Sequence, residues 1–141
     1  MKRRMLWGTF AAYCLVMLWL LFGQRMGAAG DASLNLVPFD TVSRFLWVLQ
    51  NSNQPGMITH AVVNLAGNVV MFVPLGLLLP AIWRHLRRFW LCLTAVSGVI
   101  LAIEITQLLT RLGACDVDDF ILNLAGALLG YLLWLLVRER D

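Results

Sequence analysis

The residues best suited to chemistry in this sequence are carboxylates placed at the ends of long apolar segments. Asp116, Asp118 and Asp119 fall within four positions, directly before an apolar run that begins at Phe120. Glu104 lies inside another apolar run. Burial away from water raises the pKa of a carboxyl group and suits it to act as a general base near neutral pH. Glu104 and Asp119 are therefore the two catalytic candidates.

Amide side chains accompany these carboxylates at helical spacing. Asn68 follows Asn64 by four residues, Gln107 follows Glu104 by three, and Asn123 follows Asp119 by four. Residues three or four apart share one face of a helix, so each pair lies on a common face. Polar groups of this kind hold a ligand by hydrogen bonds. The binding candidates are Asn64, Asn68, Gln107, Arg111, Asp116, Asp118 and Asn123.

The sequence excludes several other chemistries. It contains no GxSxG block, no Walker-type loop and no Cys/His metal motif, and its two histidines flank opposite membrane faces. No cofactor is therefore predicted. One alternative stays open, because oxygen ligands suit a hard divalent cation such as Mg²⁺ or Ca²⁺. Such an ion would use Glu104, Asp116, Asp118 and Asp119, although their spacing matches no EF-hand.

The elements that must position these residues are membrane helices. The chain is 60% hydrophobic and 13% charged, against about 25% charged residues in soluble domains. Only helices and closed barrels satisfy the backbone in lipid, and a spanning helix needs roughly 20 apolar residues. The sequence predicts an all-α integral membrane protein of one domain over residues 1–141, with four transmembrane helices at 5–23, 61–82, 89–109 and 120–137.

A fifth, amphipathic helix is expected in the loop that follows the first segment. Asp40 is its expected N-cap, and Val42, Phe45, Leu46 and Leu49 keep the spacing of an apolar stripe. Such a helix would lie on the membrane surface. The first segment is expected to be retained rather than cleaved as a signal peptide, because its apolar run exceeds the usual 7–15 residues.

The basic residues predict the orientation. They cluster before the first helix, between the second and third, and after the fourth, so the positive-inside rule places both termini in the cytoplasm. All the polar candidates then lie at the outer end of their helices. Because polar groups in lipid are costly, their common depth indicates a functional site facing the bundle interior. The charge balance of +3 comes from these clusters and does not indicate nucleic-acid binding.

A purely structural interpretation competes with this site. Asparagine and glutamine can hydrogen-bond neighbouring helices, and one aspartate can cap the fourth helix. Gly126 and Gly130 form a GxxxG pattern that allows close helix packing and leaves association with a second copy or other membrane proteins open. Pro74 and Pro80 predict a bend in the second membrane helix that opens space beneath the site.

Four blocks of the sequence resemble those of the VanZ-like family of membrane proteins. They are "NLVPF" at 35–39, "NLAGNVVMFVPLGLLLP" at 64–80, "EITQ" at 104–107 and "DVDDFILNLAGALLGY" at 116–131. The motif positions that carry over are Asn64, Asn68, Phe72, Pro74, Gly76, Glu104, Gln107, Asp116, Asp119, Asn123 and Gly126. Many members place a basic residue close ahead of the first aspartate, whereas here Gly113 and Ala114 intervene and Arg111 lies further back.

The resemblance implies a multi-pass protein of the bacterial cytoplasmic membrane, in a family named for a member linked to resistance to glycopeptides, in particular teicoplanin. The expected function is binding or modification of an envelope lipid or lipid-linked cell-wall precursor at the outer leaflet. Two alternatives remain. One is a structural membrane protein without catalysis, and the other is an enzyme that uses Glu104 as a base on a lipid substrate.

Overall fold

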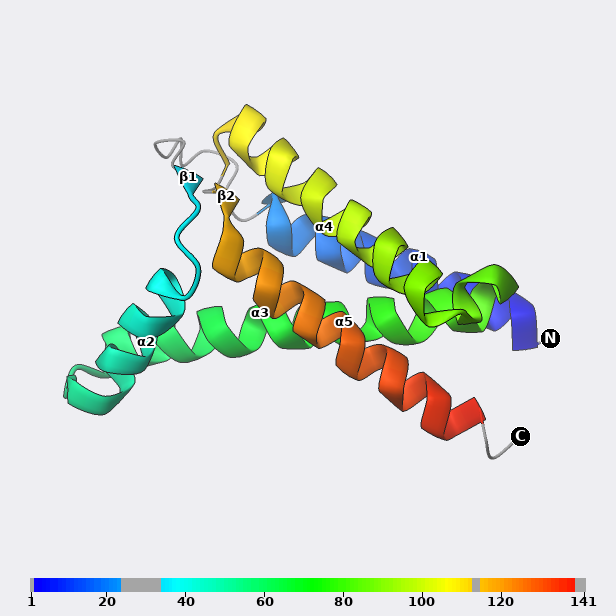
Figure 1. Ribbon diagram of the computed structural model, residues 1–141, viewed down its shortest axis with the longest axis horizontal. Helices are drawn as coiled ribbons and strands as arrows, with labels where there is room; N and C mark the ends of the chain where they lie inside the picture. The colour runs from blue at the N-terminus through cyan, green and yellow to red at the C-terminus, as the bar shows by residue number, and fades with distance from the viewer. Residues whose placement is uncertain (1, 24–33, 113–114, 139–141) are drawn as a thin grey trace.

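The computed structural model describes residues 2–23, 34–112 and 115–138. Its order of elements is α1 (Lys2–Leu21), β1 (Leu34–Asn35), α2 (Asp40–Asn51), α3 (Pro55–Ile82), the short 3₁₀ helix η2 (Arg84–Arg87), α4 (Phe89–Thr110), β2 (Cys115–Asp116) and α5 (Val117–Arg138). The all-α class predicted from the sequence is confirmed (Figure 1). Residue Arg140, Gly113, Ala114 and the loop over 24–33 lie outside the described residues.

The helices α1, α3, α4 and α5 are each long and apolar enough to cross a membrane, so the chain is a multi-pass membrane protein. Three of them, α1, α3 and α5, start earlier than the sequence predicts. Helix α3 starts at Pro55, because proline fits the first turn, where its missing N–H is not needed. Its 28 residues span about 42 Å, more than the ~30 Å of a hydrocarbon core. Helix α3 therefore extends beyond the membrane or crosses it at a tilt.

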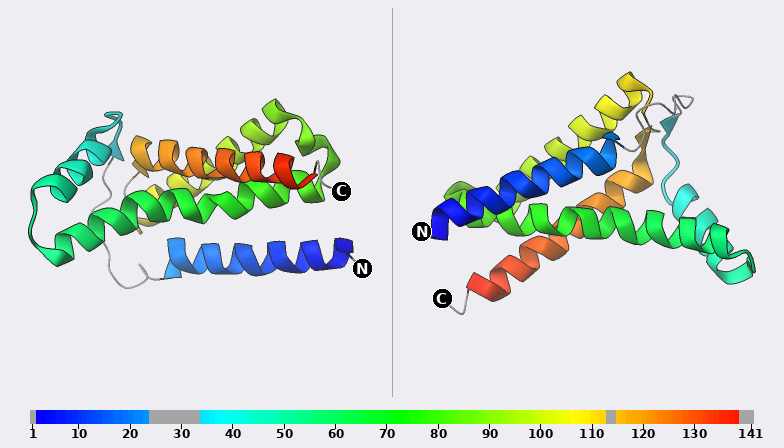
Figure 2. Two further views of the ribbon diagram at one scale, coloured as in Figure 1. Left: turned by 90° about the horizontal axis from the view of Figure 1, so that it is seen from below. Right: turned by 180° about the vertical axis from the view of Figure 1, so that it is seen from behind.

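The central packing contact joins α3 to α5, and Figure 2 (left) shows α3 between α1 and α5. A Cβ atom on Gly126 would lie 2.0 Å from the Val69 carbonyl oxygen, and one on Gly76 would lie 1.8 Å from that of Ala127. The two backbones therefore touch, as small residues permit in membranes. Helix α3 continues through Pro74 and Pro80, and Gly76 lies against α5. The bend predicted to open space beneath the site stays a prediction.

Helix α2 packs on the N-terminal end of α3, outside the region where α5 lies (Figures 1 and 2). The predicted helix is present, but Asp40 is its first residue rather than its N-cap. Phe39 holds the cap position in a left-handed conformation, at φ 64°, and its own side chain makes no capping hydrogen bond. Of the predicted stripe, Leu46 is exposed whereas Phe45 is half-buried beside His60.

Candidate functional site

Asp118 connects α5 to the start of α2. Its side chain is fully buried, with 0% exposure. One carboxylate oxygen accepts a hydrogen bond from the Phe39 amide at 2.5 Å, and the other accepts one from the Val42 amide at 3.0 Å. The first amides of a helix have no partner within the helix and carry partial positive charge. Asp118 therefore caps α2 from a position 79 residues away in the sequence.

Asp116 joins three segments. Its Oδ2 accepts hydrogen bonds from the Thr41 hydroxyl at 2.7 Å and from the Asn35 amide at 3.3 Å. Its Oδ1 accepts one from the Asp118 backbone at 2.9 Å, a turn that orients the next carboxylate. The Asp116 backbone N–H donates to Glu104 Oε2 at 3.3 Å. We call the set Asn35, Thr41, Glu104, Asp116 and Asp118 the outer polar network, after the side of the membrane that the basic residues predict for it.

A short parallel strand pair reinforces this connection. Leu34 pairs with Cys115 and Asn35 pairs with Asp116, which makes β1 and β2 a two-stranded sheet. The pairing places the segment before α2 beside the segment before α5 (Figure 1). Two of the sequence blocks described above, around residues 35–39 and 116–119, therefore lie next to each other.

Asp119 points to a different partner. Its Oδ1 accepts a hydrogen bond from Asn68 Nδ2 at 2.5 Å, and the same nitrogen lies 3.3 Å from Asn64 Oδ1. These side chains link α5 to α3, and Asp119 lies about two helix turns before the glycine contact at Gly126. The expectation that Asn64 and Asn68 share a face holds, because Asn68 donates both to Asn64 and to Asp119.

The remaining candidates do not gather at one point. Gln107 is 5% exposed and donates to the Leu21 carbonyl at the end of α1, at 3.3 Å. Arg111 ends α4 in a left-handed conformation, at φ 55°, and is exposed, so it leaves the buried face of Glu104 and Gln107. Asn123 is 3% exposed, and its Oδ1 has no hydrogen-bond partner within the described part of the chain.

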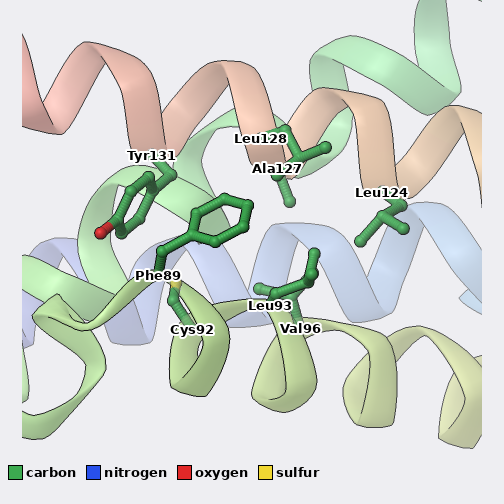
Figure 3. Close-up of a pocket in the computed structure, with 8 residues that line it drawn as sticks. All are labelled: Phe89, Cys92, Leu93, Val96, Leu124, Ala127, Leu128 and Tyr131. Carbon is green, nitrogen blue, oxygen red and sulfur yellow. The ribbon is translucent and has the colours of Figure 1, made fainter.

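The arrangement is closed rather than open. Glu104, Asp116 and Asp118 are all under 9% exposed and accept hydrogen bonds from backbone or side-chain donors. Across residues 2–23, 34–112 and 115–138, no three Asp, Glu, His or Cys side chains converge as a metal site would require. A small apolar pocket lies elsewhere, between α4 and α5, and Figure 3 shows its lining, which includes Phe89, Val96 and Tyr131.

Comparison with known families identifies the chain. A family model described as VanZ/LLP1 matches residues 10–138. The chain belongs to the VanZ/LLP1 family. It is also similar to Protein VanZ of Enterococcus faecium, with 29% identity over 133 residues that cover 90% of this chain and 71% of that protein. No solved structure gives a significant match. The family predicted from the sequence blocks is confirmed.

The sequence pattern did not predict three residues of this VanZ-family site that lie between β1 and the first turn of α2. Asn35, Phe39 and Thr41 each contribute a donor to the carboxylates of Asp116 or Asp118. The available signal was the pair of family blocks at 35–39 and 116–131, whose contact with one another the spacing alone does not reveal.

The same loop carries an apolar surface. Leu36, Val37, Phe39 and Trp47 are 58–65% exposed, although their large side chains favour burial. We call these four residues the apolar outer surface. Leu36, Val37 and Phe39 directly precede α2, whose first backbone amides Asp118 binds, and Trp47 lies on α2 itself.

Proposed function

We propose that this chain is a non-catalytic membrane protein that binds an amphiphile of the bacterial envelope on its apolar outer surface. In this proposal the outer polar network is the support that holds the surface in place. The ligand class is a lipid-linked cell-wall precursor or an envelope lipid, and the biological consequence is altered sensitivity to glycopeptide antibiotics such as teicoplanin. The last step draws on the similarity to Protein VanZ.

One observation carries the proposal. Both carboxylate oxygens of Asp118 accept hydrogen bonds, from the backbone amides of Phe39 and Val42, at 2.5 and 3.0 Å. A charged group is costly to bury, and here it is used only to fix the backbone of an exposed apolar segment. The carboxylate is therefore better suited to positioning than to reacting with a substrate.

The conformation of Phe39 supports the same conclusion. A bulky residue at positive φ costs about 1–3 kcal/mol and persists only where its surroundings impose it. Phe39 is held at φ 64° by Asp118 and presents a ring that is 58% exposed. Backbone strain that displays an aromatic ring instead of burying it favours a binding role for that ring.

The location favours a ligand of the outer leaflet. The positive-inside rule assigns the helix ends that carry both termini to the cytoplasm, which places α2 and the outer polar network at the opposite side of the bacterial cytoplasmic membrane. An exposed apolar surface at the edge of a membrane can contact acyl or prenyl chains while nearby polar groups contact a headgroup.

Phe39→Gly is the sharpest test. Glycine accepts φ 64° without strain, so the fold should be kept while the ring is lost. We expect a purified, lipid-linked cell-wall precursor to bind the variant in nanodiscs about tenfold more weakly, since an exposed ring of this size contributes on the order of 1.4 kcal/mol. Teicoplanin sensitivity of cells expressing it should shift in parallel. Trp90→Ala is the matched control, because Trp90 is 72% exposed at the other end of the bundle.

Equal binding by Phe39→Gly and the native chain would overturn the proposal. Mass spectrometry of the precursor in the same samples tests the catalytic alternative. Its two candidates are Glu104, which is only 4% exposed, and Asp119, which lies beside Asn68. A product that forms with the native chain and disappears in Glu104→Gln or Asp119→Asn would replace binding with catalysis.

A further inference from the structure

A second cleft lies between the start of α1 and the end of α5. Figure 1 shows these two helix ends at the end of the bundle opposite α2 and the outer polar network. Its volume is about 610 Å³, within the range of small-molecule sites. It opens between α1, α3 and α5 and reaches η2. Its lining is apolar along the helices and basic at the mouth: Met5, Leu6, Thr9, Leu77, Ala81, Arg87, Trp134, Val137 and Arg138.

Two arginines flank one tryptophan in this cleft. The guanidinium carbons of Arg87 and Arg138 lie 6.0 and 5.2 Å from the centre of the Trp134 ring. Trp134 itself is 6% exposed, so it is a fixed platform for both cations. The two positive groups are thereby held on one side of the cleft.

Arg87 is positioned by further contacts. Its Nε donates to the Pro80 carbonyl at 3.3 Å, and the Tyr131 hydroxyl donates to the Arg87 carbonyl at 2.9 Å. The first bond holds the Arg87 side chain and the second holds its backbone, and Arg87 lines the cleft. Arginine forks of this kind match the geometry of a phosphate.

The charge at this end lacks a matching carboxylate among the described residues. Within residues 2–23, 34–112 and 115–138, the acidic side chains are Asp40, Glu104, Asp116, Asp118 and Asp119, all on the outer loop or the outer ends of α4 and α5. Glu139 and Asp141 follow Arg138 in the sequence and lie outside the described residues. Among residues 2–23, 34–112 and 115–138, no carboxylate therefore lies at this end to neutralise Arg87 and Arg138.

We propose that this cleft binds an acidic phospholipid of the leaflet that faces the termini. The phosphate lies between Arg87 and Arg138, and an acyl chain follows the apolar wall of Met5, Leu77 and Val137. Basic pockets between helices at the cytoplasmic face bind acidic headgroups in this way. Helix α1 is loosely packed, with 6% of its spanning window buried against 22–33% in the other three, so a lipid would complete its packing.

The test uses the full chain in nanodiscs that contain either phosphatidylglycerol or phosphatidylcholine, followed by native mass spectrometry of the lipid retained. We expect one phosphatidylglycerol retained in preference to phosphatidylcholine. The double variant Arg87→Gln/Arg138→Gln should lower that preference at least about tenfold, given about 1 kcal/mol per basic residue near an acidic surface. The control Arg84→Gln/Arg88→Gln removes equal charge from exposed residues at the same end that do not line the cleft.

A second variant separates the cleft from general charge attraction. Thr9→Trp places a ring in the cleft from the exposed side of α1 and keeps both arginines. Retention of phosphatidylglycerol should fall in this variant too. Equal losses in the control and the double variant, or unchanged retention in Thr9→Trp, would overturn the proposal. Circular dichroism of each variant confirms that the helices remain folded.

Discussion

The α3–α5 contact and the outer polar network hold the chain together by opposite means. In the first, Gly76, Gly126 and Gly130 bring two backbones into contact without a polar side chain between them. In the second, Asp116 and Asp118 hold a loop and a helix by charge-assisted hydrogen bonds. Lipid gives no hydrophobic gain for helix association, so close packing is the available force there. At the membrane edge, water competes for the hydrogen bonds of polar groups, and burying a carboxylate costs less free energy than it does in the hydrocarbon core.

The groups that stabilise the fold and the groups proposed to bind a ligand lie in different places. The three glycines of the α3–α5 contact present no polar side chain, and their role is to align α5 with α3. The polar groups of the outer polar network hydrogen-bond to one another and to nearby backbone, and the surface that the network supports is apolar. The polar residues that first suggest chemistry are therefore structural in this account, and the exposed Leu36, Phe39 and Trp47 are the binding groups.

The largest effect is expected from Gly126→Ala. The added Cβ would meet the Val69 carbonyl oxygen at 2.0 Å, and backbone atoms cannot move aside as a flexible side chain would. We expect a loss of about 3 kcal/mol in the free energy of unfolding, measured in detergent by chemical denaturation. Gly98→Ala is the control, because its Cβ would meet nothing within 4 Å, and it should be neutral or stabilising. Equal losses in both variants would show that the α3–α5 contact is looser than described.

The reactivity of two cysteines distinguishes the outer polar network from the interior of the helix bundle. Cys115 is half-buried in β2, whereas Cys92 is 3% exposed in α4. In a Cys14→Ser background, an impermeant maleimide should label Cys115 and not Cys92 in intact cells. Burial raises the pKa of the Cys115 thiol, and the carboxylates of Glu104 and Asp116 raise it further. Because the thiolate reacts, labelling should increase about tenfold per pH unit and continue to rise above pH ~8.5, where an ordinary thiol levels off.

Labelling of Cys115 only after cell lysis would reverse the orientation taken from the basic residues. In that case the apolar outer surface would face the cytoplasm, and a ligand from the outer leaflet would be excluded. A labelling rate that levels off near pH 8 would instead indicate that β2 is more open than its pairing with β1 implies.

A small effect is expected at Arg111, where α4 ends. Arg111 adopts φ 55°, which favours glycine, and its side chain is exposed. Arg111→Gly should raise the free energy of unfolding by about 0.5 kcal/mol, because relief of strain exceeds the entropy cost of glycine. The same denaturation measurement applies. A clear loss of stability would assign the Arg111 side chain an interaction beyond ending the helix.

Much of the fold follows from hydropathy, because four uncharged or nearly uncharged segments of spanning length admit few arrangements. The ends of the helices follow less well. Helix α3 starts at Pro55, ahead of the apolar run from Ala61, and α5 starts at Val117 among the aspartates. Both starts make tertiary contacts with α2 that a hydropathy pattern does not report.

The site was harder to predict, because its contacts join residues far apart in the sequence. The aspartates were expected to form one site, and their common depth in the membrane stays a prediction, whereas the structure gives each of them different partners. Asp118 binds the start of α2, Asp116 binds Asn35 and Thr41, and Asp119 binds Asn68. Helical spacing reports which face a residue occupies, and it carries no information on which distant loop covers that face. Whether Glu104, Asp119 and the binding candidates contact a ligand stays a prediction.

Amide hydrogen exchange in nanodiscs measures directly whether Asp118 fixes the exposed apolar segment around Phe39. In the native chain, the Phe39 and Val42 amides should exchange slowly. In Asp118→Ala they should exchange about 30-fold faster, as expected for a lost cap of about 2 kcal/mol, while amides of α3 around Phe72 stay unchanged. Asp40→Ala is the control, since Asp40 is exposed and pairs only with Arg44 among the ion pairs described. Fast exchange at Phe39 and Val42 in the native chain, or no difference between the two variants, would contradict the claim.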